Sequence, residues 1–222
     1  MNDQSKLAYP EYDQLLELLP SGARGFRAAV LPGEAYESLK DHLESDLLLE
    51  GTQEQGYIRY RLEGKGVAIV VDLYKSAYSF RSALGDYQLL FYHGHSNYGT
   101  NNYLTDRSAF SDKYQIVAMN SCRTYSYYAR QLFEAKATPA DPTGWAAADF
   151  VATVHSNWIA YSDATIVPLL ESLLAAIEAV HRGEPHLAPD WLSILKKMDA
   201  MDRDTLYGAA GVRTNSWRPD LQ

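Results

Sequence analysis

Short apolar runs alternate along the chain with longer segments in which apolar residues recur at helical spacing. Each short run is apolar at successive positions, which predicts a strand that is buried on both faces of a sheet. The strands expected on this basis cover residues 26–31, 67–71, 89–92, 116–120 and 150–154. One further run, 57–62, alternates apolar and basic residues and predicts a half-exposed strand that turns back through 63–66.

The segments between these runs predict helices, which we expect at 34–49, 76–84, 125–134, 164–181 and 191–198. The clearest is 164–181, where Leu169, Leu173 and Ile177 fall on one face and Gly183 lies just past the end. Strands and helices that alternate in this way favour an α/β fold with a mainly parallel sheet and helices on both faces. We expect the runs at 67–71, 89–92, 116–120 and 150–154 to adjoin in that sheet.

The length of 222 residues is sufficient for one good core, so we expect a single domain. Residues 1–24 carry Pro10, Pro20 and Gly22 around a short helix candidate, and this composition predicts a lead-in segment before a domain at 25–222. From Gly208 onward the pattern predicts an irregular tail.

Charge and composition exclude several classes of function. The chain has 28 acidic and 20 basic residues, a net charge of −8, so a nucleic-acid partner has no electrostatic support. A single cysteine forms no internal disulfide, and the N-terminal residues lack the features of a secretory signal, so we expect a cytoplasmic protein. No apolar run approaches the roughly 18 to 20 residues that cross a bilayer, so we expect no membrane partner.

Chemically active side chains follow two of the predicted strands. Cys122, the only cysteine, comes just after the strand at 116–120, and His93 and His95 come just after the strand at 89–92. If these strands are parallel neighbours, thiol and imidazole emerge together at the carboxyl edge of the sheet, where open α/β sheets place their sites. A lone cysteine is more often a small buried apolar residue, but this pairing favours a cysteine nucleophile with a histidine proton carrier.

Three segments carry a resemblance to a known family. LLFYHGHSNYG resembles the histidine motif of the caspase-like cysteine peptidases, which include separases, metacaspases, gingipains and CHAT domains. QIVAMNSC is similar to their catalytic cysteine motif, and FVATVHSNWIAYSDAT, with the helix after it, resembles the downstream strand of CHAT and gingipain domains. The likeness spans about residues 86–198 in the family's order and implies a caspase-like three-layer sandwich.

The family's motif can be matched to either histidine. In the Tyr-x-Gly-His register the catalytic residue is His95, and Ser96 replaces the glycine that usually follows; in the His-Gly register it is His93. Because Tyr92 and Gly94 both fit the first register, we favour His95. A second departure is Arg123, which stands where these families often carry a small or acidic residue before a glycine.

The resemblance implies a cysteine endopeptidase that needs no cofactor or metal. Cys122 would be the nucleophile and His95 the proton carrier, with backbone amides at Cys122 and around Gly94 and Ser96 holding the oxyanion. Side chains expected to border the substrate cleft are Ser156, Asn157, Trp158 and Asp163. Asp163 also suits the N-cap of the helix that follows it.

Two other interpretations remain open. The departures at Ser96 and Arg123 are compatible with a catalytically silent caspase-like module that binds proteins through the same cleft. His93 and His95, with His155 or Asp106, could instead ligate zinc in a metal-dependent hydrolase. The partners expected are therefore a protein or peptide substrate and, as an open alternative, a regulatory partner.

Overall fold

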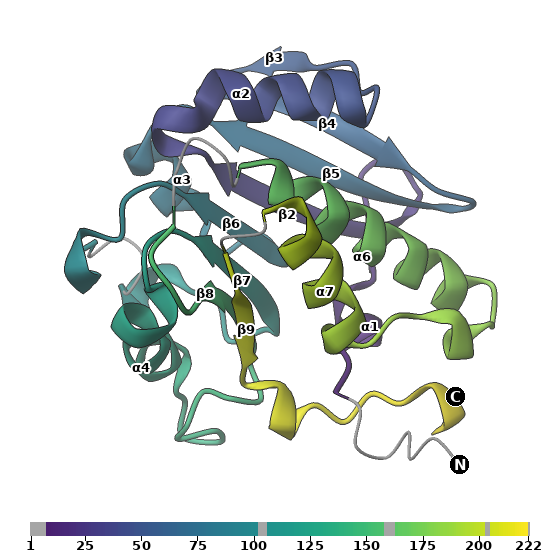
Figure 1. The fold of residues 1–222 in the computed structure, drawn as a ribbon. Helices are drawn as coiled ribbons and strands as arrows, with labels where there is room; N and C mark the ends of the chain where they lie inside the picture. The colour runs from purple at the N-terminus through teal and green to yellow at the C-terminus, as the bar shows by residue number, and fades with distance from the viewer. Residues whose placement is uncertain (1–7, 102–105, 158–162, 203–204, 222) are drawn as a thin grey trace.

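The computed structural model describes residues 8–101, 106–157, 163–202 and 205–221, and these form a mixed sheet with helices on both sides (Figure 1). Its strands are β1 (Glu17–Leu18), β2 (Arg24–Leu31), β3 (Thr52–Glu54), β4 (Tyr57–Glu63), β5 (Val67–Tyr74), β6 (Leu89–His93), β7 (Gln115–Asn120), β8 (Ala148–Thr153) and β9 (Tyr207–Ala210). Its α-helices are α1 (Tyr12–Leu15), α2 (Tyr36–Asp41), α3 (Ala77–Ala83), α4 (Thr124–Lys136), α6 (Ile166–His181) and α7 (Trp191–Met201).

The strand order across the sheet is β3-β4-β5-β2-β6-β7-β8-β9, with β1 paired to the start of β2. The five inner strands from β5 to β8 are parallel, whereas β3, β4 and β9 are antiparallel to their neighbours. Our expectation that 67–71 adjoins 89–92 is wrong, because β2 lies between β5 and β6. β2 is mainly apolar apart from Arg24 and Arg27, so it too fits a position that is covered on both faces.

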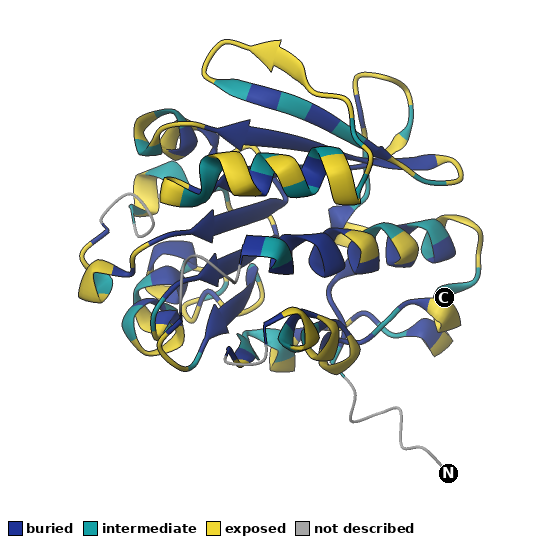
Figure 2. Ribbon diagram, turned by 45° about the horizontal axis from the view of Figure 1, so that its top comes forward, coloured by how far each residue is buried: buried dark blue, intermediate teal, exposed yellow. Residues whose placement is uncertain are grey.

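Helices cover the two faces of the sheet and make a three-layer α/β sandwich. Alternate residues of the inner strands pack against α2, α6 and α7 on one face and against α3 and α4 on the other. Figure 2 shows the inner strands buried along most of their length and the helices exposed on their outer sides. The parallel, two-sided burial explains why the inner strands are mainly apolar.

Helix α6 is the main element on the first face. The segment Asp163–His181 is long enough and apolar enough, with a mean hydropathy of 1.5, to cross a membrane by length and composition alone, contrary to our expectation that no apolar segment reaches that length. Leu169, Leu173 and Ile177 are fully buried against the sheet and α7. The apolar composition of α6 is therefore explained by its central place in the core.

The described part of the predicted lead-in segment contributes to the core. Tyr12 and Leu15 are fully buried, and β1 extends the sheet beside β2. The Glu11 carboxylate accepts a hydrogen bond from the backbone N–H of Trp217, 3.1 Å away, so the beginning and the end of the described chain are tied together. β9 lies in the region that we expected to be irregular from Gly208 onward.

The buried carboxylate of Asp149 also holds the C-terminal segment against the core. Oδ2 of Asp149 accepts hydrogen bonds from the Tyr114 hydroxyl at 2.7 Å, from Trp191 Nε1 at 2.6 Å and from Asn215 Nδ2 at 2.7 Å. Burial raises the pKa of Asp149 to about 7, although the three donors act in the opposite direction. This one side chain of β8 thus joins the residue just before β7, the start of α7 and the C-terminal segment.

Stability should fall with rising pH because of Asp149. Between about pH 4 and pH 7 the folded protein holds a proton that the unfolded chain has released, so the free energy of unfolding decreases across this window. Asp149→Asn removes this titration. Over the same pH range, the free energy of unfolding of this variant should therefore decrease less than that of the wild type, by up to about 4 kcal/mol. Urea unfolding of both proteins at a series of pH values measures the difference. Equal slopes for the two proteins would contradict this role of Asp149.

Candidate active site

The carboxyl ends of β6 and β7 lie side by side at one edge of the sheet. The two strands are parallel and in register, and their last residues, His93 and Asn120, pair with each other. The Gly94 N–H donates to the Asn120 carbonyl at 3.3 Å, which keeps the two chains together past the strand ends. His95 and Cys122 each follow two residues after this pair, so both emerge at the same edge.

A cavity of about 400 Å³ opens at this edge. It is lined by His95, Ser96, Asn97, Tyr98, Cys122, Arg123, Tyr127 and Ser156. The fold therefore brings the predicted nucleophile, the favoured histidine, Ser96 and Ser156 around one space. Tyr127, Asn97 and Tyr98 were not predicted to line it; Asn97 and Tyr98 lie within the quoted histidine motif, whereas Tyr127 lies on α4 after the cysteine.

Cys122 is half-buried beside the segment that follows β8. Its Sγ lies 3.4 Å from the Asn157 N–H, which donates to it, and 3.3 Å from the Asn157 carbonyl oxygen, which accepts from the thiol. Helix α4 begins two residues later, at Thr124. The thiol therefore lies next to the N-terminus of α4, the end that carries a partial positive charge.

His95 lines the same cavity, and 61% of its side chain is exposed. Its Nε2 is 3.7 Å from a carboxylate oxygen of Glu34, which is itself on the surface. The backbone of His95 is held more firmly, because its carbonyl accepts hydrogen bonds from the Tyr92 hydroxyl at 2.7 Å and from Asn101 Nδ2 at 3.0 Å. The ring is therefore accessible while its attachment point is fixed.

A buried tyrosine from α4 connects the two sides of the cavity. The Tyr128 hydroxyl donates to the Ser96 carbonyl and accepts from the Asn101 N–H at 3.2 Å. Burial raises the pKa of Tyr128, so the hydroxyl remains a donor at neutral pH. Because α4 also begins beside Cys122, this hydrogen bond ties the histidine loop to the helix that follows the cysteine.

Backbone strain gathers around the same cavity. Among the described residues, the non-glycine residues with positive φ are Leu48, Asn97, Tyr98 and Arg123, and the last three line the cavity. Left-handed backbone is unfavourable for residues with a side chain and is found preferentially at functional sites. The strain is therefore independent support for a functional site at this edge.

Arg123 allows a direct test of this strain. Its φ and ψ are 51° and 34°, a conformation that glycine adopts without penalty. Arg123→Gly should leave the free energy of unfolding unchanged or raise it by up to about 1 kcal/mol, whereas Arg123→Val should lower it by about 1–2 kcal/mol. Urea unfolding of the two variants measures both changes. A valine variant as stable as the glycine variant would show that this backbone is not strained.

The alternative histidine has a different environment. His93 is fully buried and is not among the described residues that line the cavity, whereas His95 is. The geometry therefore favours the register that assigns the proton carrier to His95. Gly94 keeps φ at +155°, and a side chain there would meet the Tyr92 hydroxyl, so this position needs glycine. Its N–H is already donated to Asn120, which leaves the amides of Cys122 and Ser96 as the oxyanion donors to consider.

The remaining predicted substrate residues are placed differently. Ser156 is exposed and lines the cavity, whereas the Asn157 side chain is buried and donates to Asn120. The Asp163 carboxylate accepts from the Ala164 N–H at 3.1 Å and lies 3.7 Å from His42 Nε2, so it packs at the start of α6. Trp158 lies outside the described residues.

A metal site has little support in the described part of the chain. No group of three or more histidine, cysteine, aspartate or glutamate side chains there is arranged to hold a metal ion. Asp106, which we considered as a ligand, instead pairs with Arg81 and caps a short turn at Ser108. Comparison of the sequence with protein-family models and with curated proteins gives no match.

Proposed function

We propose that the protein is a caspase-like cysteine endopeptidase in which Cys122 is the nucleophile and His95 the proton carrier. The observation that carries the proposal is the shared cavity. The only cysteine of the sequence and an accessible imidazole line one space at the carboxyl edge of neighbouring parallel strands. The resemblance of the three sequence motifs to caspase-like peptidases supports the same assignment.

The proposed reaction needs only groups at this edge. His95 takes the thiol proton, and Sγ of Cys122 attacks the carbonyl carbon of the scissile peptide bond to form a carbon–sulfur bond. As the carbon–nitrogen bond breaks, His95 gives its proton to the leaving amine. Water then attacks the thioester, His95 accepts the proton of that water, and the acid product leaves with restoration of the thiol.

The negative charge that develops on the carbonyl oxygen requires hydrogen-bond donors. The N–H groups of Cys122 and Ser96 donate to no other described atom, and both residues line the cavity. Donors of this kind are typically worth a few kcal/mol in the transition state. The strained residues Asn97 and Arg123 fix the backbone next to these two amides.

Cleavage of mixed peptides tests the proposal directly. The purified protein is incubated with a diverse peptide library, and new termini are identified by mass spectrometry. We expect cuts that share a preferred residue at the scissile bond and that disappear after alkylation of Cys122. No cleavage under reducing conditions, over a range of pH values, would contradict an endopeptidase that is active without a further partner.

A silent binding module is the second candidate, and the environment of Cys122 favours it. Both hydrogen-bonding capacities of the thiol are directed at the Asn157 backbone. In such a module the cavity would hold a peptide without cutting it. Binding of library peptides that are recovered intact would distinguish this function from hydrolysis.

A further inference from the structure

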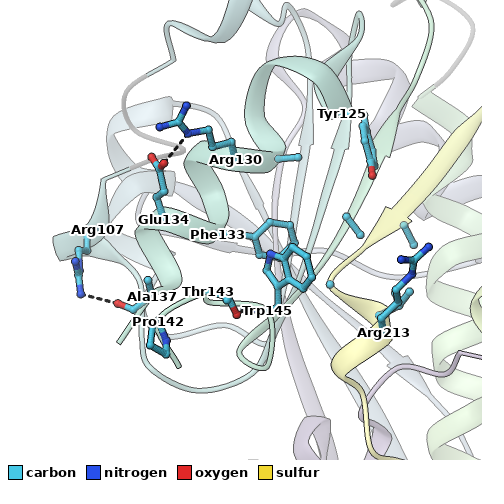
Figure 3. Close-up of a pocket in the computed structure, with 15 residues that line it drawn as sticks. Arg107, Tyr125, Arg130, Phe133, Glu134, Ala137, Pro142, Thr143, Trp145 and Arg213 are labelled. Atoms are coloured by element: carbon cyan, nitrogen blue, oxygen red, sulfur yellow. Dashed lines mark hydrogen bonds and ion pairs between the residues drawn. The ribbon is translucent and has the colours of Figure 1, made fainter. Parts of the chain in front are cut away.

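A second and larger cavity, of about 870 Å³, lies between α4 and the edge strand β9 (Figure 3). We call it the β9 groove and define it by Tyr125, Phe133, Trp145, Ala210 and Arg213. None of the described residues that line it also lines the cavity at Cys122. Its size falls in the range of sites that take a ligand of several residues or a drug-sized molecule.

Small residues on β9 explain why the groove is open. Ala210 packs with the core on the α4 side of the sheet, and a side chain built on Gly208 would point at the Tyr125 ring, 3.7 Å away. Because successive side chains of a strand point to opposite faces, the only residues that β9 places on the α4 side of the sheet are Gly208 and Ala210. The Trp145 ring, whose centroid lies 6.0 Å from that of the buried Phe133, is therefore left partly uncovered, and Trp145 is 44% exposed.

The groove runs beside an unpaired sheet edge. β9 is the last strand in the order, and the Leu206 carbonyl faces β8, where it accepts from the Val154 N–H at 2.9 Å. In an antiparallel pair, alternate residues direct their N–H and C=O toward the neighbouring strand. Because Leu206 faces β8, Gly208 does so too, and the N–H and C=O of Ala209 point away from β8. The Tyr207 N–H, on the same outer side, is capped by the Asp199 carboxylate at 2.9 Å, whereas Ala209 has no such partner among the described residues.

The charge at the rim is positive although the chain as a whole carries −8. The rim holds Arg107, Arg130 and Arg213 with one acidic residue, Glu134, which pairs with Arg130 at 2.6 Å. Arg213 is exposed and pairs with no described carboxylate. Figure 3 shows it across the groove from Trp145. An acidic occupant would therefore meet an unpaired cation beside an apolar floor.

We propose that the β9 groove binds an acidic peptide in extended conformation as an additional strand on β9. Its backbone would pair with the N–H and C=O of Ala209, an apolar side chain would pack on Phe133 and Trp145, and a carboxylate would pair with Arg213. Backbone pairing supplies affinity in this mode of recognition, and the side-chain contacts supply specificity. The site is separate from the proposed dyad and does not depend on it.

A fluorescein-labelled peptide, Glu-Val-Trp-Val-Glu, is the probe, and Lys-Val-Trp-Val-Lys is its charge-reversed counterpart. Anisotropy titrations should show saturable binding of the acidic peptide and binding of the basic peptide at least about tenfold weaker. Arg213→Glu should weaken the acidic peptide by about tenfold or more and strengthen the basic one. Lys65→Glu, an equal change of charge at an exposed turn, should alter binding by less than about twofold.

Two further variants locate the binding. Ala210→Leu fills the floor and should abolish binding of both peptides; if it does not fold, the Arg213→Glu and Lys65→Glu pair decides alone. Cys122→Ala should bind the acidic probe as the wild type does. The proposal is overturned by absence of binding up to about 1 mM, by equal affinity for the two peptides, by loss of binding in Cys122→Ala, or by a dimer that Ala210→Leu dissociates.

Discussion

Cys122→Ala is expected to abolish peptide hydrolysis while leaving the fold intact. The substitution removes the only thiol of the chain, and no other group at the cavity can form the thioester. Loss of a catalytic nucleophile typically lowers kcat by more than about a thousandfold. Cys122 is half-buried at a strand end, and the free energy of unfolding should change by no more than about 1 kcal/mol. Initial cleavage rates and urea unfolding measure the two quantities.

Ser121→Ala is the matched control for this variant. Ser121 is fully buried next to Cys122, and its hydroxyl has no hydrogen-bond partner among the described residues. Its removal should therefore change neither cleavage nor stability by a large factor. Full activity in Cys122→Ala would eliminate the cysteine-peptidase mechanism. Equal loss in both variants would indicate that the strand end, and not the thiol, is what activity requires.

His95→Ala should lower kcat by about 10²–10⁴-fold with little change in stability. The leaving amine loses its proton donor, and general acid–base catalysis is typically worth this factor. The His95 side chain is 61% exposed, so its truncation creates no cavity. His93→Ala should do the opposite: it opens a space in the core and lowers stability by about 2–4 kcal/mol, while the folded fraction keeps most of its activity.

Rates normalised to the folded fraction, measured by circular dichroism, separate these two effects. The pH profile adds a second readout, because loss of the proton carrier should remove its limb from the pH dependence of kcat/KM. If folded His93→Ala is inactive and His95→Ala is not, the catalytic role moves to His93.

The inner strands were predictable because each is covered on both faces and therefore contains a mainly apolar run. β6, β7 and β8 appear where the runs at 89–92, 116–120 and 150–154 predict them, and helices follow at about the expected positions. The order of the strands across the sheet was harder to predict from the sequence. β2, β5 and β6 carry the same kind of sequence, and nothing in the local pattern distinguishes which of them lies between the other two.

The edge strands could not be predicted in the same way. β9 contains Gly208, Ala209 and Ala210, which have neither alternation nor strong β-propensity, and it exists because it pairs with β8. The β9 groove depends on these same small residues, so it was equally hidden in the sequence. β1 is two residues long and owes its conformation to β2.

The candidate site was predictable as far as strand ends determine it. Parallel neighbouring strands bring their following residues to one edge, which is why Cys122, His95 and Ser156 line one cavity. Tyr98 and Tyr127 reach the cavity through a strained loop and a helix face, and such contacts follow from the tertiary fold alone. The expectation that Asp163 caps the helix is wrong: α6 begins at Ile166 with Thr165 as its N-cap, and Asp163 accepts from the Ala164 N–H in the short turn before it.

Labelling with a peptidyl acyloxymethyl ketone tests the proposed dyad most directly. The carboxylate leaving group of this probe is weak, so rapid reaction requires an activated thiolate with a positioned proton carrier. Mass spectrometry should find one adduct, on Cys122, that forms rapidly in the wild type and in folded His93→Ala and at least about a hundredfold more slowly in His95→Ala. Absence of the adduct, or an adduct that forms at the same rate without His95, would contradict the proposed mechanism.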